Sequence, residues 1–174
     1  MTEAAEEAVV RKAVHVKASI ERAFSVFVEQ MGRWWPASHH IGKTPFETII
    51  IEPRAGGKWY ERSAAGERCE WGTVLKWDPP HGATFSWHLG PGHSGPDWVM
   101  DPDPAKASEV EVRFTAEGPG ATLVELIHSK LDRHGEGYEE LRAIFERPTA
   151  WQGVLEFYAG SFELETANTA KEHQ

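Results

Sequence analysis

The sequence lacks the features that would tie the protein to a membrane, to nucleic acid or to an oxidising compartment. Its single cysteine, Cys69, cannot form an intramolecular disulfide. No apolar run approaches the roughly 18 residues that a membrane span needs. The N-terminus carries acids and alanines where a secretory signal would have a basic start and an apolar stretch. With a net charge of −9, neither nucleic acid nor an anionic membrane is a favoured partner. We therefore expect a cytoplasmic protein.

Cofactor motifs are missing as well. Neither HExxH nor CxxC occurs, and the nine histidines do not have the spacing of a preformed metal site. The segment Gly90–Gly95 spells G-x-G-x-x-G, but Pro96, Pro102 and Pro104 follow it where a dinucleotide loop would open a helix. We expect no metal and no other cofactor.

Tryptophan is what the chain has in abundance, with eight in 174 residues. The segment Pro53–Leu89 is typical of three consecutive antiparallel strands, and it places Trp59, Trp71 and Trp87 at alternating positions that share one face. Such a face either packs an aromatic core or walls a cavity for an apolar ligand. Because eight tryptophans exceed what a dry core of this size usually needs, we favour a pocket.

The first part of the chain predicts a strand followed by a helix. Val9–Val16 is rich in β-branched residues and indicates the strand. Ser19 suits a helix N-cap, and the apolar residues of Ile20–Met31 repeat with helical spacing. Gly32 is the expected end of this helix.

From Phe46 onward the period of the apolar residues changes to two. Six more strands are predicted, near Phe46–Glu52, Gly57–Arg62, Arg68–Trp77, Ala83–Leu89, Ser108–Ala116 and Thr122–Ser129. Most connections are too short for a parallel crossover, so the sheet should be antiparallel.

The segment from Gly90 to Ala107 is predicted to lack regular structure, which is unusual inside a compact domain. Trp98 and Met100 lie in its middle and form an apolar knot in an acidic, proline-rich loop. One hypothesis is that they act as a lid over the mouth of the cavity. A packed surface loop without function is the alternative.

The chain ends in helix. Tyr138–Phe145 shows a weak helical stripe, and after Pro148 a longer one runs from Trp151 to Phe162. That stripe must be buried, and the indole-lined sheet face is the available surface. We therefore predict an α+β fold, a curved antiparallel sheet of about seven strands wrapped around the long C-terminal helix. The order is a strand, two helical segments, six strands and the final helix. Residues 9–165 should form a single domain, with flexible tails at 1–8 and 166–174.

Two polar residues accompany the indoles. By strand alternation Glu61 shares a face with Trp59, and His128 shares one with Val124 and Leu126. Either side chain could project into the cavity and serve proton transfer or a hydrogen bond to a ligand. The alternative is that each makes a satisfied structural hydrogen bond.

Several short motifs, in this order, resemble those of the bacterial proteins related to the activator of the ninety-kilodalton heat-shock chaperone ATPase. They are Pro53–Gly57, Glu61, Gly66, Gly72–Val74, Asp78–Pro80, Trp87, Gly120–Leu123 and His128. The resemblance covers roughly Val10 to Phe162 and implies the helix-grip fold of the START-like, or SRPBCC, superfamily. It also implies a container that in different members serves lipid carriers, hormone receptors, polyketide cyclases or chaperone modulators.

Three functions remain open on the sequence. The first is non-enzymatic binding of a small hydrophobic or aromatic molecule between sheet and C-terminal helix. The second, implied by the resemblance, is a chaperone-associated stress-response module. The third is a metal-free enzyme of the cyclase or dehydratase type that uses Glu61 or His128 as acid and base. The expected ligand-binding residues are Trp35, Trp59, Glu61, Trp71, Trp87, His128, Trp151 and Tyr158.

Overall fold

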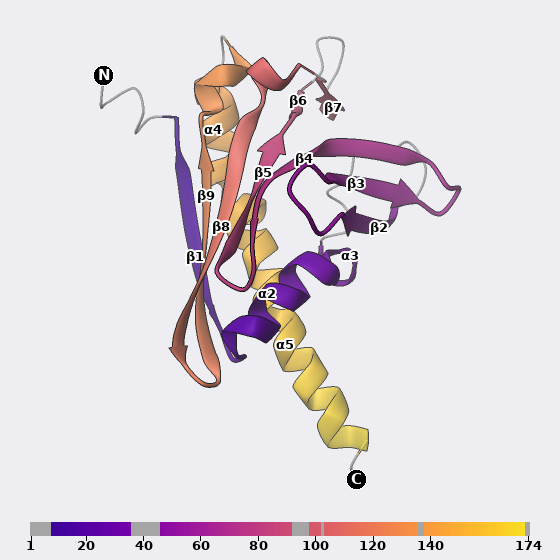
Figure 1. Cartoon of the computed structure of the whole chain (residues 1–174), viewed down its shortest axis with the longest axis vertical. Coiled ribbons are helices and arrows are strands. Elements are labelled where there is room, and N and C mark those ends of the chain that lie inside the picture. Colours follow the sequence, from indigo (N-terminus) through magenta and orange to yellow (C-terminus); the bar gives the residue numbers. More distant parts are fainter. Residues whose placement is uncertain (1–7, 36–45, 92–97, 102, 136–137, 173–174) are drawn as a thin grey trace.

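The computed structural model describes residues 8–35, 46–91, 98–101, 103–135 and 138–172, and its main feature is a curled antiparallel sheet (Figure 1). The strands are β1 (Val10–Val16), β2 (Phe46–Ile51), β3 (Lys58–Ser63), β4 (Arg68–Asp78), β5 (Gly82–Trp87), β8 (Ser108–Gly118) and β9 (Ala121–Ser129). They pair in the order β1-β9-β8-β5-β4-β3-β2, each with its neighbours antiparallel. The α+β class and the seven-stranded antiparallel sheet predicted from the sequence are confirmed.

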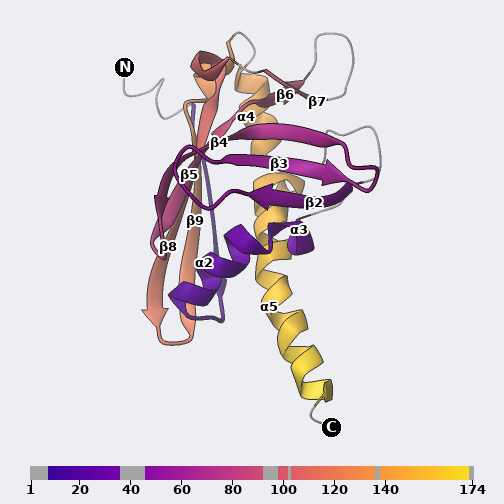
Figure 2. The same ribbon diagram turned by 45° about the vertical axis from the view of Figure 1, so that its right-hand side comes forward.

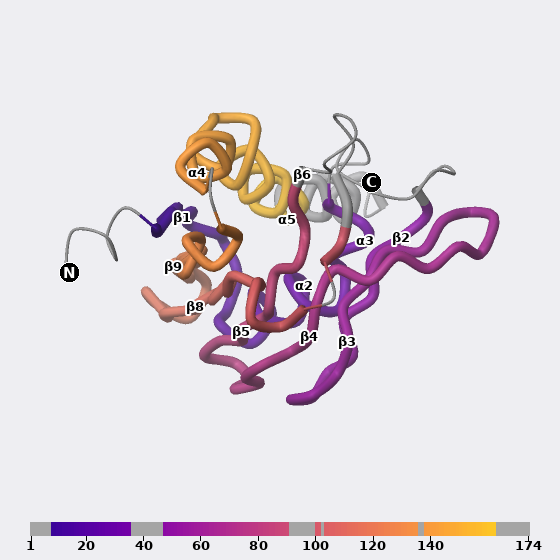
Figure 3. The backbone as a smooth tube through the Cα atoms, turned by 90° about the horizontal axis from the view of Figure 1, so that it is seen from above, coloured from indigo at the N-terminus to yellow at the C-terminus, as the bar shows by residue number. Residues whose placement is uncertain are grey.

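Helices fill the concave side of this sheet. Between β1 and β2 lie α2 (Ile20–Glu29) and α3 (Met31–Trp34), and after β9 come α4 (Tyr138–Glu146), the π-helical turn η3 (Pro148–Gln152) and α5 (Gly153–Glu172). Figure 2 shows β2, β3 and β4 crossing in front of α5 at a steep angle to β8 and β9. Seen from above, the strands form an arc with α2 and α5 on its inner side (Figure 3). The core therefore lies between the arc and these two helices.

The first helix begins as predicted and ends differently. Ser19 Oγ accepts a hydrogen bond from the Arg22 N–H at 3.3 Å, which is the expected N-cap. Gly32 is not the terminator: α2 ends at Glu29, and Gly32 lies inside α3. A Cβ at Gly32 would overlap Oγ1 of Thr48 on β2. Gly32 therefore allows α3 to approach β2 closely. The prediction that Gly32 ends the first helix was wrong.

The segment after β5 is also more regular than predicted. The strands β6 (Leu89–Pro91) and β7 (Trp98–Met100) form a small antiparallel sheet, and a 3₁₀ turn, η1 (Pro104–Lys106), follows. The two ends of this segment are joined by a hydrogen bond in which the backbone N–H of Asp101 donates to the His88 carbonyl at 3.0 Å. Strands of three residues carry too little alternation to be detected in a sequence.

Ala8 is buried, and its carbonyl accepts a hydrogen bond from the N–H of Leu131 at 3.1 Å. Leu131 opens η2 (Leu131–His134), a short 3₁₀ helix that follows β9. The domain limits 9–165 stay a prediction. No helix in the described ranges has the length and apolar character of a membrane span.

Candidate functional site

Five tryptophans meet in the core between the sheet and the beginning of α5. Neighbouring ring centroids lie 5.0 Å apart for Trp35 and Trp71, 5.2 Å for Trp71 and Trp59, and 5.8 Å for Trp59 and Trp87. The circuit closes through Trp87 and Trp151 at 5.2 Å and Trp151 and Trp35 at 6.0 Å. We call these five residues the tryptophan cluster. Each is at most 6% exposed, and most pairs are tilted or edge-to-face, as aromatic quadrupoles prefer.

The sheet supplies three members because strand alternation turns Trp59 of β3, Trp71 of β4 and Trp87 of β5 to the same concave face. Gly72 makes the tight packing possible. A Cβ at this position would overlap the carbonyl oxygen of Ser86 and crowd the indole nitrogen of Trp59. Without that Cβ, the Trp59 N–H reaches across β4 and donates to the Ser86 carbonyl at 3.0 Å.

Three other indoles of the cluster also donate inside the protein. The Trp87 N–H donates to the Leu89 carbonyl at 2.8 Å. The Trp71 N–H donates to Glu61 Oε1 at 2.9 Å, and the Trp151 N–H donates to His128 Nδ1 at 3.0 Å. Two of the four acceptors are therefore titratable side chains, Glu61 and His128, that are themselves 1% and 0% exposed. This end of the core combines an aromatic wall with buried acid–base groups.

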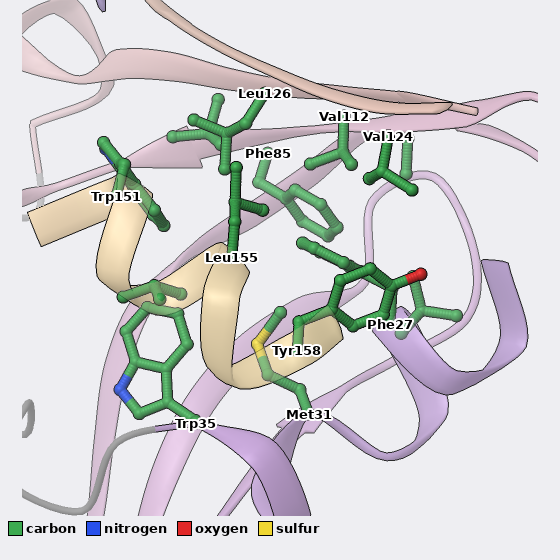
Figure 4. Packing of buried hydrophobic residues seen from close by; sticks show 14 of the residues in the cluster. Phe27, Met31, Trp35, Phe85, Val112, Val124, Leu126, Trp151, Leu155 and Tyr158 are labelled. Carbon is green, nitrogen blue, oxygen red and sulfur yellow. The ribbon is translucent and has the colours of Figure 1, made fainter. Parts of the chain in front are cut away.

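An internal cavity of about 10 Å³ lies against this cluster. Its lining comprises Phe27, Met31, Trp35, Trp59, Phe85, Val110, Val112, Leu126 and Trp151. A cavity of that size is about the minimum for one water molecule. In Figure 4, Trp35 and Trp151 bound one end of this packed region, with Met31 and Phe85 between them and Phe27. The aromatic wall is thus present in a closed, nearly filled form.

Tyr158 belongs to a different group of side chains. Its hydroxyl donates to the Ala23 carbonyl of α2 at 2.6 Å, and its ring lies 5.1 Å from those of Phe27 and Trp34. With Phe24, Phe114 and Phe162 these residues form what we call the phenylalanine cluster (Phe24, Phe27, Trp34, Phe114, Tyr158, Phe162). Tyr158 is buried, as an aromatic stripe on the last helix requires, but it does not line the cavity described above.

Glu61 lies opposite Cys69 in the pairing of β3 with β4. Burial first, and then the charges of Glu61 and Glu67, raise the pKa of the Cys69 thiol to about 11. The thiol is therefore protonated at neutral pH and a weak nucleophile. Glu61 serves the site as an acceptor for the Trp71 indole.

His128 connects the cluster to a chain of hydrogen bonds that leads outward. Its Nε2 lies 2.7 Å from Ser108 Oγ, and the same hydroxyl lies 2.7 Å from Nε2 of His134 on η2. Because Nδ1 of His128 accepts from Trp151, the neutral ring carries its proton on Nε2 and donates it to Ser108. Ser108 can then donate to His134, which is half-buried.

Both histidines resist protonation. Complete burial, followed by the proximity of His134, lowers the pKa of His128 well below its usual value. Burial and then the neighbouring His88 lower the pKa of His134, while Asp101 acts in the opposite direction. A proton on this chain is therefore better accommodated at His134, beside a carboxylate, than at His128.

The structure brings together most of the residues that the sequence singled out. Trp35, Trp59, Trp71, Trp87 and Trp151 form one cluster, and Glu61 and His128 are its hydrogen-bond acceptors. His128 lies behind Trp151 and does not line the cavity.

Sequence reasoning missed two residues, Ser108 and His134. Ser108 could have been found, because it shares the inner face of β8 with Val110, the pairing partner of His128. His134 is the last residue of η2, a short 3₁₀ turn that begins after Lys130, a residue in the left-handed conformation (φ 60°). No sequence pattern predicts such a turn.

The structure describes only part of the segment that was predicted to act as a lid. Met100 is half-buried and packs against the core. The side chain of Trp98 lies outside the described residues, as does most of the segment Gly90–Gly95. The lid stays a prediction. In the part of the chain that the structure describes, no three His, Cys, Asp or Glu side chains gather as metal ligands would.

One family model matches most of the chain. Residues 17–152 match the model of the family described as Activator of Hsp90 ATPase homolog 1-like protein. No curated protein matches the chain in sequence.

Solved structures support the same assignment. One described as an anthrahydroquino-γ-pyrone synthase complexed with SUM is 39% identical, covers 87% of this chain and 95% of its own, and superposes with a TM-score of 0.60. CalC of Micromonospora echinospora, described as a self-sacrificing resistance protein, is 27% identical over 91% of this chain and 96% of its own, with a TM-score of 0.65. A protein of Nitrosomonas europaea, 11% identical over 92% of this chain and 97% of its own with a TM-score of 0.61, shows the fold alone.

Proposed function

The chain belongs to the family of Activator of Hsp90 ATPase homolog 1-like proteins, in the helix-grip SRPBCC superfamily, and from this premise we propose that it binds a planar polycyclic hydroxyaromatic molecule. The proposed binding site lies between the sheet and the start of α5. The observation that carries the proposal is the tryptophan cluster, three of whose members line the internal cavity. Flat indoles offer stacking surfaces to a flat ligand, and the buried Glu61 and His128 offer acceptors to its hydroxyl groups.

Binding requires the closed form to open. Pockets for drug-sized ligands measure about 300 Å³ or more, whereas this cavity measures about 10 Å³. Trp59, Trp71 and Trp87 are held by the strands that carry them. Trp35 follows α3, and Trp151 lies in the π-helical turn next to Ala150, whose backbone is non-helical (φ −86°, ψ −124°). These two indoles are the ones that we expect to move aside, and π-helical turns are common at functional positions.

A titration with emodin, a hydroxyanthraquinone, tests the proposal by its effect on tryptophan fluorescence. We expect saturable quenching with a Kd in the range of about 1–100 µM. Trp35→Phe and Trp151→Phe should each change the Kd about fivefold or more, equivalent to about 1 kcal/mol. Trp77→Phe is the matched control, because Trp77 lies against Phe24 and away from the cavity. Quenching that never saturates, or equal responses of all three variants, would contradict the proposal.

A ring-closing activity of the cyclase type is the second candidate. It is favoured by the 39% identity to a γ-pyrone synthase and by the buried His128 and Ser108 behind the cluster. In such a reaction a phenol oxygen adds to a ketone carbonyl, and one water leaves as the ring becomes aromatic. An ortho-hydroxyaryl 1,3-diketone is a suitable substrate. Mass spectrometry should show a product lighter by one water that forms faster with the protein than with His128→Gln.

The family description also names a chaperone ATPase, and a chaperone partner is a separate proposal. It would need an exposed apolar docking surface. Among the described residues the exposed large hydrophobic side chains are Leu75 on β4 and Phe157 on α5. We expect no change in the ATPase rate of the ninety-kilodalton chaperone on adding the protein, and a dose-dependent increase would favour the chaperone function instead.

A further inference from the structure

We propose that His128, Ser108 and His134 form a proton relay that carries a proton from a hydroxyl group of the bound ligand to the half-buried His134 on η2. The inference rests on the proposed binding function and adds to it a direction and an end point for the proton. The relay begins behind Trp151, at the wall of the cavity, and ends at the half-buried His134.

The hydrogen bonds fix the polarity of the resting state. Trp151 donates to His128 Nδ1 at 3.0 Å, so the proton of the neutral ring is on Nε2 and points to Ser108 Oγ at 2.7 Å. The Ser108 hydroxyl has one proton to give and two acceptors within reach. His134 Nε2 lies at 2.7 Å and the Trp87 carbonyl at 3.5 Å, so the hydroxyl donates to His134.

In the closed form Trp151 covers Nδ1 of His128, the basic nitrogen that faces the cluster among the described residues. The same indole lines the cavity, so a ligand that takes its place removes the donor from Nδ1. A buried lone pair without a donor is costly, and an acidic O–H of the ligand is the natural replacement. Ligand entry and exposure of the base are therefore one event.

The transfer balances without any added reactant. The ligand O–H gives its proton to His128 Nδ1, His128 passes its Nε2 proton to Ser108 Oγ, and Ser108 passes its own proton to His134 Nε2. The products are a phenolate, a neutral His128 in the other tautomer, a neutral Ser108 and a cationic His134. Each hydrogen bond survives with donor and acceptor exchanged.

The surroundings favour charge at the outer end. His128 is 0% exposed, with Phe145 at 4.6 Å and Trp87 at 5.4 Å between ring centroids. His134 is half-buried, and Asp101 favours its charged form while His88 opposes it. Among the described residues of the neighbouring segments, ion pairs join Lys130 and Arg133 to Glu109 and Lys106 to Asp101, and Asp132 lies on η2 itself. The relay therefore places the positive charge on His134, in a partly hydrated site, and leaves His128 neutral in the aromatic interior.

The test uses the absorbance of emodin, whose phenolate absorbs at longer wavelength than its phenol. We expect the apparent pKa of bound emodin to rise by about one unit or more in His134→Gln, a tenfold loss of phenolate at fixed pH. The glutamine oxygen can still accept from Ser108 but cannot take the proton, so the affinity for the neutral dye should stay within about twofold. His15→Gln is the control, since His15 is exposed and paired with Glu117 elsewhere on the sheet.

A second measurement needs no ligand. Through the relay the Nε2 proton of His128 exchanges with water by way of His134, and NMR can follow this exchange. We expect His134→Gln to slow it at least tenfold and His15→Gln to leave it unchanged. Equal exchange rates in the His134 variant and the parent overturn the relay, whatever the dye does. The relay is also overturned if bound emodin has the same apparent pKa in the His134 variant and in the parent. If emodin does not bind at all, the result contradicts the proposed function and not the relay.

Discussion

The two aromatic clusters of the core use similar side chains for different ends. In the phenylalanine cluster the described hydrogen bonds run to helix backbone, from Trp34 to the Val26 carbonyl at 3.0 Å and from Tyr158 to the Ala23 carbonyl at 2.6 Å. In the tryptophan cluster two of the indoles donate to titratable side chains, Glu61 and His128. Backbone carbonyls do not change charge, so the hydrogen bonds of the first cluster only stabilise, and the member of that cluster that lines the cavity is the apolar Phe27. The second can also respond to protons and to a ligand.

Truncation in the phenylalanine cluster should give the largest loss of stability and the clearest separation of the two regions. Phe114 is 4% exposed and contacts Phe24 and Phe27 edge-to-face. Phe114→Ala should lower the free energy of unfolding by about 3–5 kcal/mol, because a buried ring is replaced by a cavity. Urea denaturation measures the loss. Emodin affinity should stay within about twofold of the parent, and a parallel loss of affinity would show that the clusters are not independent.

Removal of one acceptor from the tryptophan cluster should have the next largest effect. Glu61→Ala leaves the buried indole N–H of Trp71 without its carboxylate, which should cost about 2 kcal/mol of unfolding free energy. Glu61→Gln keeps an oxygen in the same place and should cost less than half as much. The pair of urea curves tests this, and equal losses for alanine and glutamine would mean that the hydrogen bond to Trp71 contributes nothing.

Acid should destabilise the protein through the tryptophan cluster. The pKa of His128 is lowered in the folded protein, so below pH 6.5 the unfolded chain binds a proton that the folded one does not. Stability therefore falls as pH drops through 6.5, by about 1.4 kcal/mol at pH 5.5 from His128 alone. His128→Gln can accept from Trp151 and donate to Ser108 without titrating. The difference between the two pH profiles, measured by thermal unfolding, should show this loss, and parallel profiles would contradict it.

The smallest of these effects should come from Tyr158. Tyr158→Phe removes one hydrogen bond to the Ala23 carbonyl and leaves the ring contacts in place. We expect a loss of about 1 kcal/mol in urea and no change in emodin affinity. An affinity change of fivefold or more would place Tyr158 in the ligand site after all and would remove the distinction between the clusters.

The parts of the fold that depend on period and length could be predicted from the sequence. Alternation located the seven strands and the shared face of Trp59, Trp71 and Trp87, and the stripe from Trp151 to Phe162 located the last helix. The end of the first helix could not be predicted, because Gly32 serves a contact with Thr48 that is distant in sequence.

The candidate site could be predicted as a set of residues but not as a network. Glu61 and His128 were identified as inward-facing polar side chains, which strand alternation is sufficient to show. The partners of His128 come from β8, η2 and η3, and only folding determines that Ser108 and His134 meet there. Sequence patterns describe faces of single elements, whereas hydrogen bonds between elements depend on their packing.

The closed circuit of five indoles also makes the protein a sensitive optical reporter of its own interior. The centroids of neighbouring rings lie 5.0–6.0 Å apart, close enough for the indoles to exchange excitation energy. A single quenching molecule beside any one of them should therefore also dim its neighbours, and near-ultraviolet circular dichroism should show coupled indole bands that change when one member is replaced.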